Sequence, residues 1–153
     1  MNMVHTFAIC AYGESPYLEE CIQSLLNQKT ESKILIATST PNRQILEMGE
    51  KYDIPIFVNY LEKGLAGDWN FAYNCANTPL VTLAHQDDRY YENYTEDILA
   101  AAKKCRHPLI LFTDYNELRN GKTVTDNRLL KVKRLLLSPL KLPIFWKSRF
   151  IRR

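Results

Sequence analysis

Short apolar runs alternate along most of the chain with longer segments in which apolar residues recur at helical spacing. The apolar runs, each too short for a helix, are residues 7–10, 33–37, 55–58, 80–84 and 109–113. The segments after the first four runs predict helices, each with one apolar face. This alternation predicts βαβ units, and runs that are apolar throughout predict a parallel sheet with helices on both faces. We therefore expect an α/β fold with a mostly parallel central sheet.

Two local signals predict where elements begin and turn. Ser15 precedes Pro16, the pairing typical of a helix start, so we expect Ser15 to cap the first helix. Asn120 and Gly121 predict a tight β-hairpin whose arms are residues 114–119 and 122–125.

The third predicted helix, residues 65–76, begins in a glycine-containing segment. Gly64 and Gly67 resemble a turn that holds phosphate before a helix, although a plain helix entry explains them better. No dinucleotide-binding or P-loop glycine motif is present. Trp69 and Tyr73 lie on the apolar side of this helix, so we expect them in the core.

Composition indicates one globular domain. The chain has 153 residues, of which 46% are hydrophobic and 24% charged, and it contains no apolar run of 18 residues. Its N-terminus has no secretory pattern. The four cysteines form no CxxC pair, so we expect reduced, mostly buried thiols and a cytoplasmic location.

Charge separates a body, residues 1–127, from a tail, residues 128–153. The body holds 11 Lys and Arg against all 17 Asp and Glu, a net charge of −6. The tail holds nine basic residues and no acidic one. Such a tail suits an anionic membrane or nucleic acid, although a merely solvated helix has the same composition.

Polar residues follow several predicted strands, and the most distinctive group is His85-Gln86-Asp87-Asp88. Ligands of open α/β sheets bind beyond the carboxyl ends of the strands. Adjacent carboxylates repel each other, and a hard cation such as Mg²⁺ or Mn²⁺ relieves that repulsion. The alternative is that Asp87 or Asp88 only caps a turn.

Three segments resemble family 2 glycosyltransferases, in the family's order and at its distances over residues 6–120. The first segment resembles the strand, loop and "YLEECLxSLLxQ" sequence that open the family's domain, and it consists of Ile9-Cys10-Ala11-Tyr12-Gly13 and Tyr17-Leu18-Glu19-Glu20-Cys21-Ile22-Gln23-Ser24-Leu25-Leu26-Asn27-Gln28. Residues 64–70 resemble its "GxaxaRN" segment, and residues 83–88 resemble its "LDxDD" metal motif. The resemblance implies a GT-A fold, which is a Rossmann-like three-layer α/β/α architecture.

The resemblance also implies the ligands and their residues. It implies a metal, Mn²⁺ or Mg²⁺, on Asp87 and Asp88, and a UDP- or dTDP-linked sugar as donor. The nucleotide-sugar contacts that it implies are Ala11, Tyr12, Glu14, Thr38, Gly67, Asn70 and Asp87.

The chain departs from the family pattern at four points. Residues 38–40 read Thr-Ser-Thr where the family has an acidic pair, and His85 replaces the first aspartate of the metal motif. Asp68 and Trp69 stand near the usual arginine. Family members continue for about another hundred residues that carry the general base, so we expect this chain alone to be inactive in transfer, as a fragment or a short member.

The favoured function is transfer of a sugar, with inversion, to a hydroxyl of a glycan or lipid-linked acceptor in cell-surface polysaccharide or glycolipid synthesis. An alternative is a non-catalytic nucleotide-binding module derived from such an enzyme. A phosphate-accepting receiver domain fits poorly, because such domains need an acidic pair after the first strand and a lysine after the last. We expect no nucleic-acid partner, and we expect residues 128–153 either to contact the inner face of the membrane or to pack against an acceptor region that is absent here.

Overall fold

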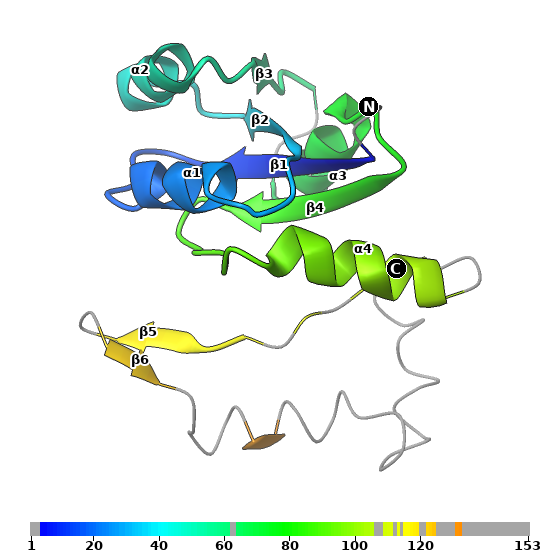
Figure 1. Cartoon of the computed structure of the whole chain (residues 1–153). Coiled ribbons are helices and arrows are strands. Elements are labelled where there is room, and N and C mark those ends of the chain that lie inside the picture. Colours follow the sequence, from blue (N-terminus) through cyan, green and yellow to red (C-terminus); the bar gives the residue numbers. More distant parts are fainter. Residues whose placement is uncertain are drawn as a thin grey trace. The chain divides into compact units, whose positions relative to one another are not determined.

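The computed structural model describes residues 4–61, 64–105, 109–111, 113, 115–119, 122–124 and 131–132. The chain divides into two compact units, Met1–Pro108 and Leu109–Arg153. The first unit alternates strands and helices, and the second contains a small hairpin (Figure 1). The predicted division between residues 127 and 128 stays a prediction, and its tail lies outside the described residues apart from Lys131 and Val132.

Four parallel strands form the sheet of the first unit. They are β1 (His5–Ala11), β2 (Lys33–Thr38), β3 (Ile56–Val58) and β4 (Leu80–His85). Their order is β3-β2-β1-β4, so β1 pairs with both β2 and β4. Ile9 aligns with Ile36 on one side and with Ala84 on the other. The predicted parallel α/β sheet is confirmed.

Helices cover both faces of this sheet (Figure 1), because side chains along β1 point alternately to the two sides. Phe7 and Ile9 pack in a core that includes residues of α1 (Leu18–Leu26) and α2 (Arg43–Tyr52), with Tyr94 of α4 (Tyr94–Lys104) against it. Ala8 packs in a second core with Ala72 of α3 (Leu65–Cys75). The unit therefore has the predicted three layers. No helix in the described part of the chain is long and apolar enough to span a membrane.

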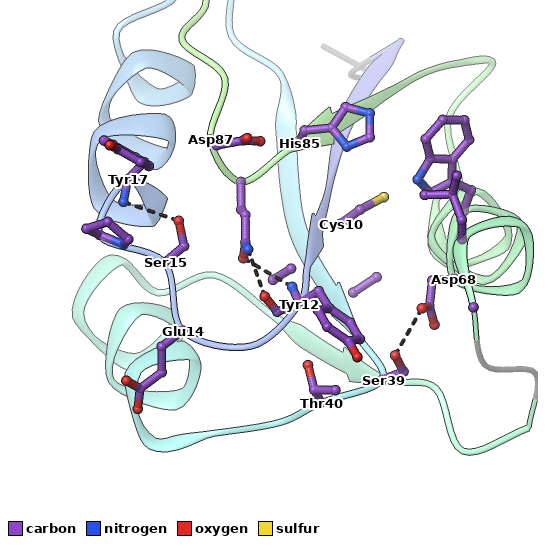
Figure 2. A pocket seen from close by; sticks show the side chains of 17 residues that line it. Cys10, Tyr12, Glu14, Ser15, Tyr17, Ser39, Thr40, Asp68, His85 and Asp87 are labelled. Atoms are coloured by element: carbon purple, nitrogen blue, oxygen red, sulfur yellow. Dashed lines mark hydrogen bonds between the residues drawn. The ribbon is translucent and has the colours of Figure 1, made fainter. Parts of the chain in front are cut away.

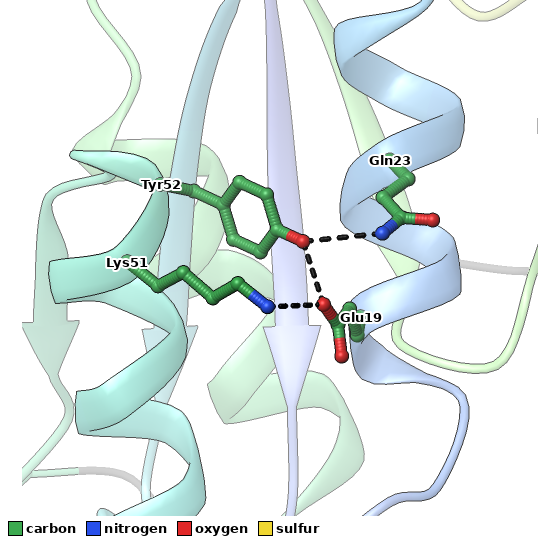
Figure 3. A network of polar contacts seen from close by, with 4 residues as sticks. All are labelled: Glu19, Gln23, Lys51 and Tyr52. Carbon is green, nitrogen blue, oxygen red and sulfur yellow. Dashed lines mark hydrogen bonds and ion pairs between the residues drawn. The ribbon is translucent and has the colours of Figure 1, made fainter.

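A polar network holds α2 against α1 (Figure 3). Glu19 Oε1 accepts from Lys51 Nζ at 2.6 Å and from the Tyr52 hydroxyl at 2.7 Å, and Gln23 Nε2 donates to that hydroxyl at 3.2 Å. These bonds to Lys51 and Tyr52 lower the pKa of Glu19. Because the ion pair is exposed, it fixes the position of α2 more than it stabilises the fold.

The amino-terminal edge of the sheet carries a buried polar cluster around His5. The ring nitrogens of His5 lie 2.8 Å from Ser32 Oγ and 2.9 Å from Thr82 Oγ1. Burial lowers the pKa of His5 to about 4, so the ring is neutral near pH 7. Its hydrogen bonds make His5 a structural residue.

The first helix begins later than predicted, and Ser15 does not cap it. Tyr17 is the N-cap residue, and it makes no side-chain capping bond. Ser15 Oγ instead accepts from the Tyr17 backbone N–H at 3.2 Å, in the turn before the helix. The reason is that the backbone N–H and C=O of Ser15 are both bonded to Gln44 of α2, which fixes Ser15 in the preceding loop.

In the second unit the predicted hairpin is confirmed with shorter arms. β5 (Glu117–Arg119) pairs antiparallel with β6 (Lys122–Val124), and the predicted turn, residues 120–121, lies outside the described residues. The strand predicted at residues 109–113 is wrong, because residues 109–111 and 113 form no strand. An apolar run alone does not decide between a strand and irregular chain.

The prediction that most of the cysteine thiols are buried is wrong. All four cysteines are free, but only Cys21 is buried. Cys105 is exposed because α4 ends one residue before it.

Candidate functional site

An open pocket of about 700 Å³ lies at the carboxyl edge of the parallel sheet (Figure 2). The loops after β1, β2 and β4 and the first turns of α3 form its walls. Parallel strands bring these loops to one edge, where ligands of open α/β sheets bind. The pocket is lined by residues 10–12, 14–17, 37, 39–40, 64–65, 68–69 and 85–87.

Two glutamine side chains hold the loop after β1 by its backbone. Gln86 Nε2 donates to the Tyr12 carbonyl at 2.8 Å, and Gln86 Oε1 accepts from the Tyr12 N–H at 3.1 Å. Gln44 makes the same pair of bonds with Ser15, at 2.8 and 2.9 Å. Each side-chain amide thus supplies the backbone N–H and C=O of its loop residue with the hydrogen-bond partners that a neighbouring strand would otherwise provide. We refer to these two residues as the glutamine clamps.

Gly13 lies in the same loop between Tyr12 and Ser15, and its backbone N–H and C=O are also hydrogen-bonded by side chains. Thr40 Oγ1 accepts from the Gly13 N–H at 2.7 Å, and Asn42 Nδ2 donates to its carbonyl at 2.9 Å. The backbone of Gly13 has φ 63, in the left-handed region that favours glycine. The loop is therefore pre-formed, with Tyr12 and Glu14 on the pocket wall (Figure 2).

The pocket is acidic. Glu14, Asp68 and Asp87 line it, and no lysine or arginine is among its described lining residues. Asp68 is held by two neutral donors: Ser39 Oγ donates to its Oδ2 at 3.0 Å and Asn59 Nδ2 donates to its Oδ1 at 2.9 Å. Its charge adds to burial in raising the pKa of Cys10 to about 11.

Asp87 and Asp88 follow β4 in a turn in which the Asp88 N–H donates to the His85 carbonyl at 3.1 Å. Partial burial raises the pKa of the Asp88 carboxyl, the nearby His85 ring opposes this rise, and Asp87 adds to it. Within the described residues, no three His, Cys, Asp or Glu side chains gather as a metal centre. Two adjacent carboxylates fit a hard divalent cation only if the ligand itself supplies further oxygen atoms.

The pocket brings together four of the predicted contacts, Ala11, Tyr12, Glu14 and Asp87. Thr38 is buried outside the lining, and its hydroxyl accepts from the Thr40 N–H. The remaining predicted residues, Gly67, Asn70 and Asp88, are also absent from the lining. No bound ligand tests these assignments, which stay predictions.

Sequence reasoning missed the side of α3 that lines the pocket. Trp69 was expected in the core, but it lines the pocket and packs edge-on against His85, with ring centroids 5.2 Å apart. Tyr73, expected there too, is exposed. Gly67 lies inside α3, whereas Gly64 is its N-cap with φ 103. The helix start at Gly64, directly beyond the strand ends, was the available signal that residues of its first turns face a ligand.

The parallel sheet, with its pocket at the carboxyl edge, defines a GT-A, Rossmann-like α/β domain. A crystal structure of S. aureus TarS 1-349 has the same fold, with a TM-score of 0.56 and 22% sequence identity. The match covers 67% of this chain and 33% of the TarS chain, so this chain spans about a third of that length.

The model of glycosyl transferase family 2 matches residues 6–153. The chain therefore belongs to glycosyl transferase family 2, and the resemblance of its motifs to that family is confirmed. A search of curated proteins finds no match.

We predict that Gln86→Leu loosens the loop after β1, because both backbone groups of Tyr12 lose their partner. Amide hydrogen exchange at Tyr12 should become about tenfold faster, corresponding to about 1.4 kcal/mol of lost local stability. Gln23→Leu on α1 is the matched control, since among the described residues the Gln23 side chain bonds the Tyr52 hydroxyl and no group of the loop after β1. Equal exchange at Tyr12 in the two variants would show that the clamp does not hold the loop.

Proposed function

We propose that this chain forms the nucleotide-sugar-binding part of an inverting, metal-dependent glycosyltransferase. The donor is a UDP- or dTDP-linked sugar. The acceptor is a hydroxyl of a glycan or a lipid-linked glycan, in cell-surface polysaccharide or glycolipid synthesis on the cytoplasmic side of the membrane. The observation that carries the proposal is the open, acidic pocket at the carboxyl edge of the sheet in a family 2 chain.

The charge of the pocket supports a metal-dependent ligand. Glu14, Asp68 and Asp87 repel a diphosphate, and no described lysine or arginine of the lining opposes them. A divalent cation removes this conflict, because it binds carboxylate and phosphate oxygens together. Asp87 and Asp88 are the residues that we assign to Mn²⁺ or Mg²⁺. When bound, the cation supplies charge stabilisation to the departing nucleoside diphosphate.

We assign to residues of this chain the binding and orientation of the nucleotide-sugar donor. The clamped loop presents Tyr12 and Glu14 to the nucleotide without having to order itself on binding, which lowers the entropic cost of association. Ala11, the last residue of β1, also lines the pocket, and we keep Thr38, Gly67 and Asn70 as predicted contacts of the donor. No general base is assigned among the described residues, and we expect it in a region C-terminal to them.

Ligand-induced stabilisation tests the proposal. We expect UDP with Mn²⁺ to raise the free energy of unfolding by about 2.7 kcal/mol at a hundredfold excess over Kd, and UDP alone to raise it much less. Asp87→Asn combined with Asp88→Asn should abolish the difference between UDP with and without Mn²⁺. Asp53→Asn is the control, because it removes an acidic charge at the C-terminal end of α2, outside the pocket lining. Metal-dependent stabilisation that survives the double substitution would refute the metal assignment.

We also propose that the basic, leucine-containing segment 128–153 contacts the membrane on which the acceptor resides. Its nine basic residues each contribute about 1 kcal/mol near an anionic surface. Co-sedimentation with phosphatidylcholine vesicles should require added phosphatidylserine, weaken with salt and disappear when the chain ends at Asn127. Sedimentation that ignores lipid charge or persists after truncation would reject this contact.

A further inference from the structure

A carboxylate lies at the end of β2 although residues 38–40 carry none. It belongs to Asp68 in the first turns of α3, and it reaches the β2 end by accepting from Ser39 Oγ at 3.0 Å (Figure 2). Asn59, which is buried after β3, donates to the other carboxylate oxygen at 2.9 Å. Two donors from different loops therefore fix the orientation of this carboxylate on the pocket wall.

The Asp68 carboxylate retains capacity to bind a ligand. Its two oxygens offer about four acceptor positions, and the two side-chain hydrogen bonds use two of them. Among the described residues, no lysine or arginine pairs with it. A negative group with free acceptor positions binds N–H and O–H donors and repels phosphate oxygens. Asp68 therefore suits an uncharged, hydrogen-bond-donating part of a ligand.

The sheet places Asp68 away from the proposed metal residues. Ser39 follows β2 and Asp87 follows β4, and β1 lies between these two strands. Two strand spacings separate the ends of β2 and β4 by about 10 Å. A nucleoside diphosphate is long enough to extend over this distance, with its phosphates at one end and its nucleoside at the other. Tyr12, at the end of β1 between them, presents an exposed aromatic ring to the same pocket.

We propose that Asp68 is the anchor of the nucleoside half of the donor, accepting an N–H of the base or an O–H of the ribose. Ser39 and Asn59 are positioning residues that hold its carboxylate. The inference rests on the proposed function and adds to it a residue and a ligand group: Asp87 serves the phosphate end, and Asp68 serves the nucleoside end.

The test compares UDP with inorganic pyrophosphate, both with Mn²⁺, by calorimetric titration of the 153-residue chain. Pyrophosphate has no nucleoside. Asp68→Asn should therefore weaken UDP about tenfold or more, as expected for a lost hydrogen bond to a charged group, and should not weaken pyrophosphate. Asp53→Asn should change neither affinity. Ser39→Ala, which keeps the charge but removes one orienting bond, should weaken UDP selectively and by a smaller factor.

Further probes distinguish the two sources of the donor hydrogen. If the base supplies it, Asp68→Asn should remove a preference for UDP over CDP. If a ribose hydroxyl supplies it, the substitution should have no effect on the UDP analogue that lacks that hydroxyl, which is 2′-deoxy-UDP or 3′-deoxy-UDP. Either pattern supports the proposal and identifies the group.

Two results would overturn the inference. Equal weakening of UDP and pyrophosphate would place Asp68 in the phosphate site, and unchanged UDP affinity would remove it from the ligand. If the Asp68→Asn variant does not fold, the Ser39→Ala variant tests the inference instead. Selective weakening of UDP relative to pyrophosphate supports it, and equal or no weakening contradicts it. A wild-type chain that binds neither probe would refute the proposed function itself, which distinguishes that failure from the failure of Asp68.

Discussion

The pairing of β1 with β2 on one side and β4 on the other is the constraint on which the pocket depends. Because all these strands run parallel, the loops that follow them meet at one edge of the sheet. The loop after β1 lies between its two neighbours, so Gln86 after β4 and Gln44 in α2 reach its backbone from opposite sides. Register and loop geometry are thus coupled, because a shift of β1 by one residue would separate these partners and turn the side chains of β1 to the opposite faces of the sheet.

The chemistry of the pocket follows from how its charges are held. Ser39 and Asn59, both neutral, orient the Asp68 carboxylate, and neutral glutamines rather than basic residues hold the loop that carries Glu14. Among the described residues, these neutral partners leave the carboxylate charges of the pocket without a basic counter-charge, so they act on a ligand. Such a pocket favours cations and hydrogen-bond donors. This is why a diphosphate ligand implies a metal on one side, while its nucleoside can be bound by a carboxylate on the other.

Much of the fold could be predicted from the sequence, because apolar runs and helical spacing report burial directly. The position of Asp87 after a predicted strand also identified it as a pocket residue, and the family resemblance implied Tyr12 and Glu14. Asp68 and Trp69 could not be placed, since their helical spacing is the same whether the face meets a core or a ligand. The glutamine clamps escaped prediction because they join residues far apart in sequence, and this pairing also displaced the expected Ser15 cap. The run at residues 109–113 has the apolar content of a strand but lacks strand pairing among the described residues.

The central claim is that the carboxyl edge of the sheet binds a metal and a nucleotide together. Paramagnetic broadening by Mn²⁺ in amide NMR spectra tests it most directly. With UDP present, Mn²⁺ should broaden the signals of residues 85–88 and, more weakly, of residues 12–14. The signals of His5 and Ser32, at the amino-terminal edge, should remain sharp. Broadening that is uniform, that is centred on another part of the chain, or that does not depend on UDP would contradict the account.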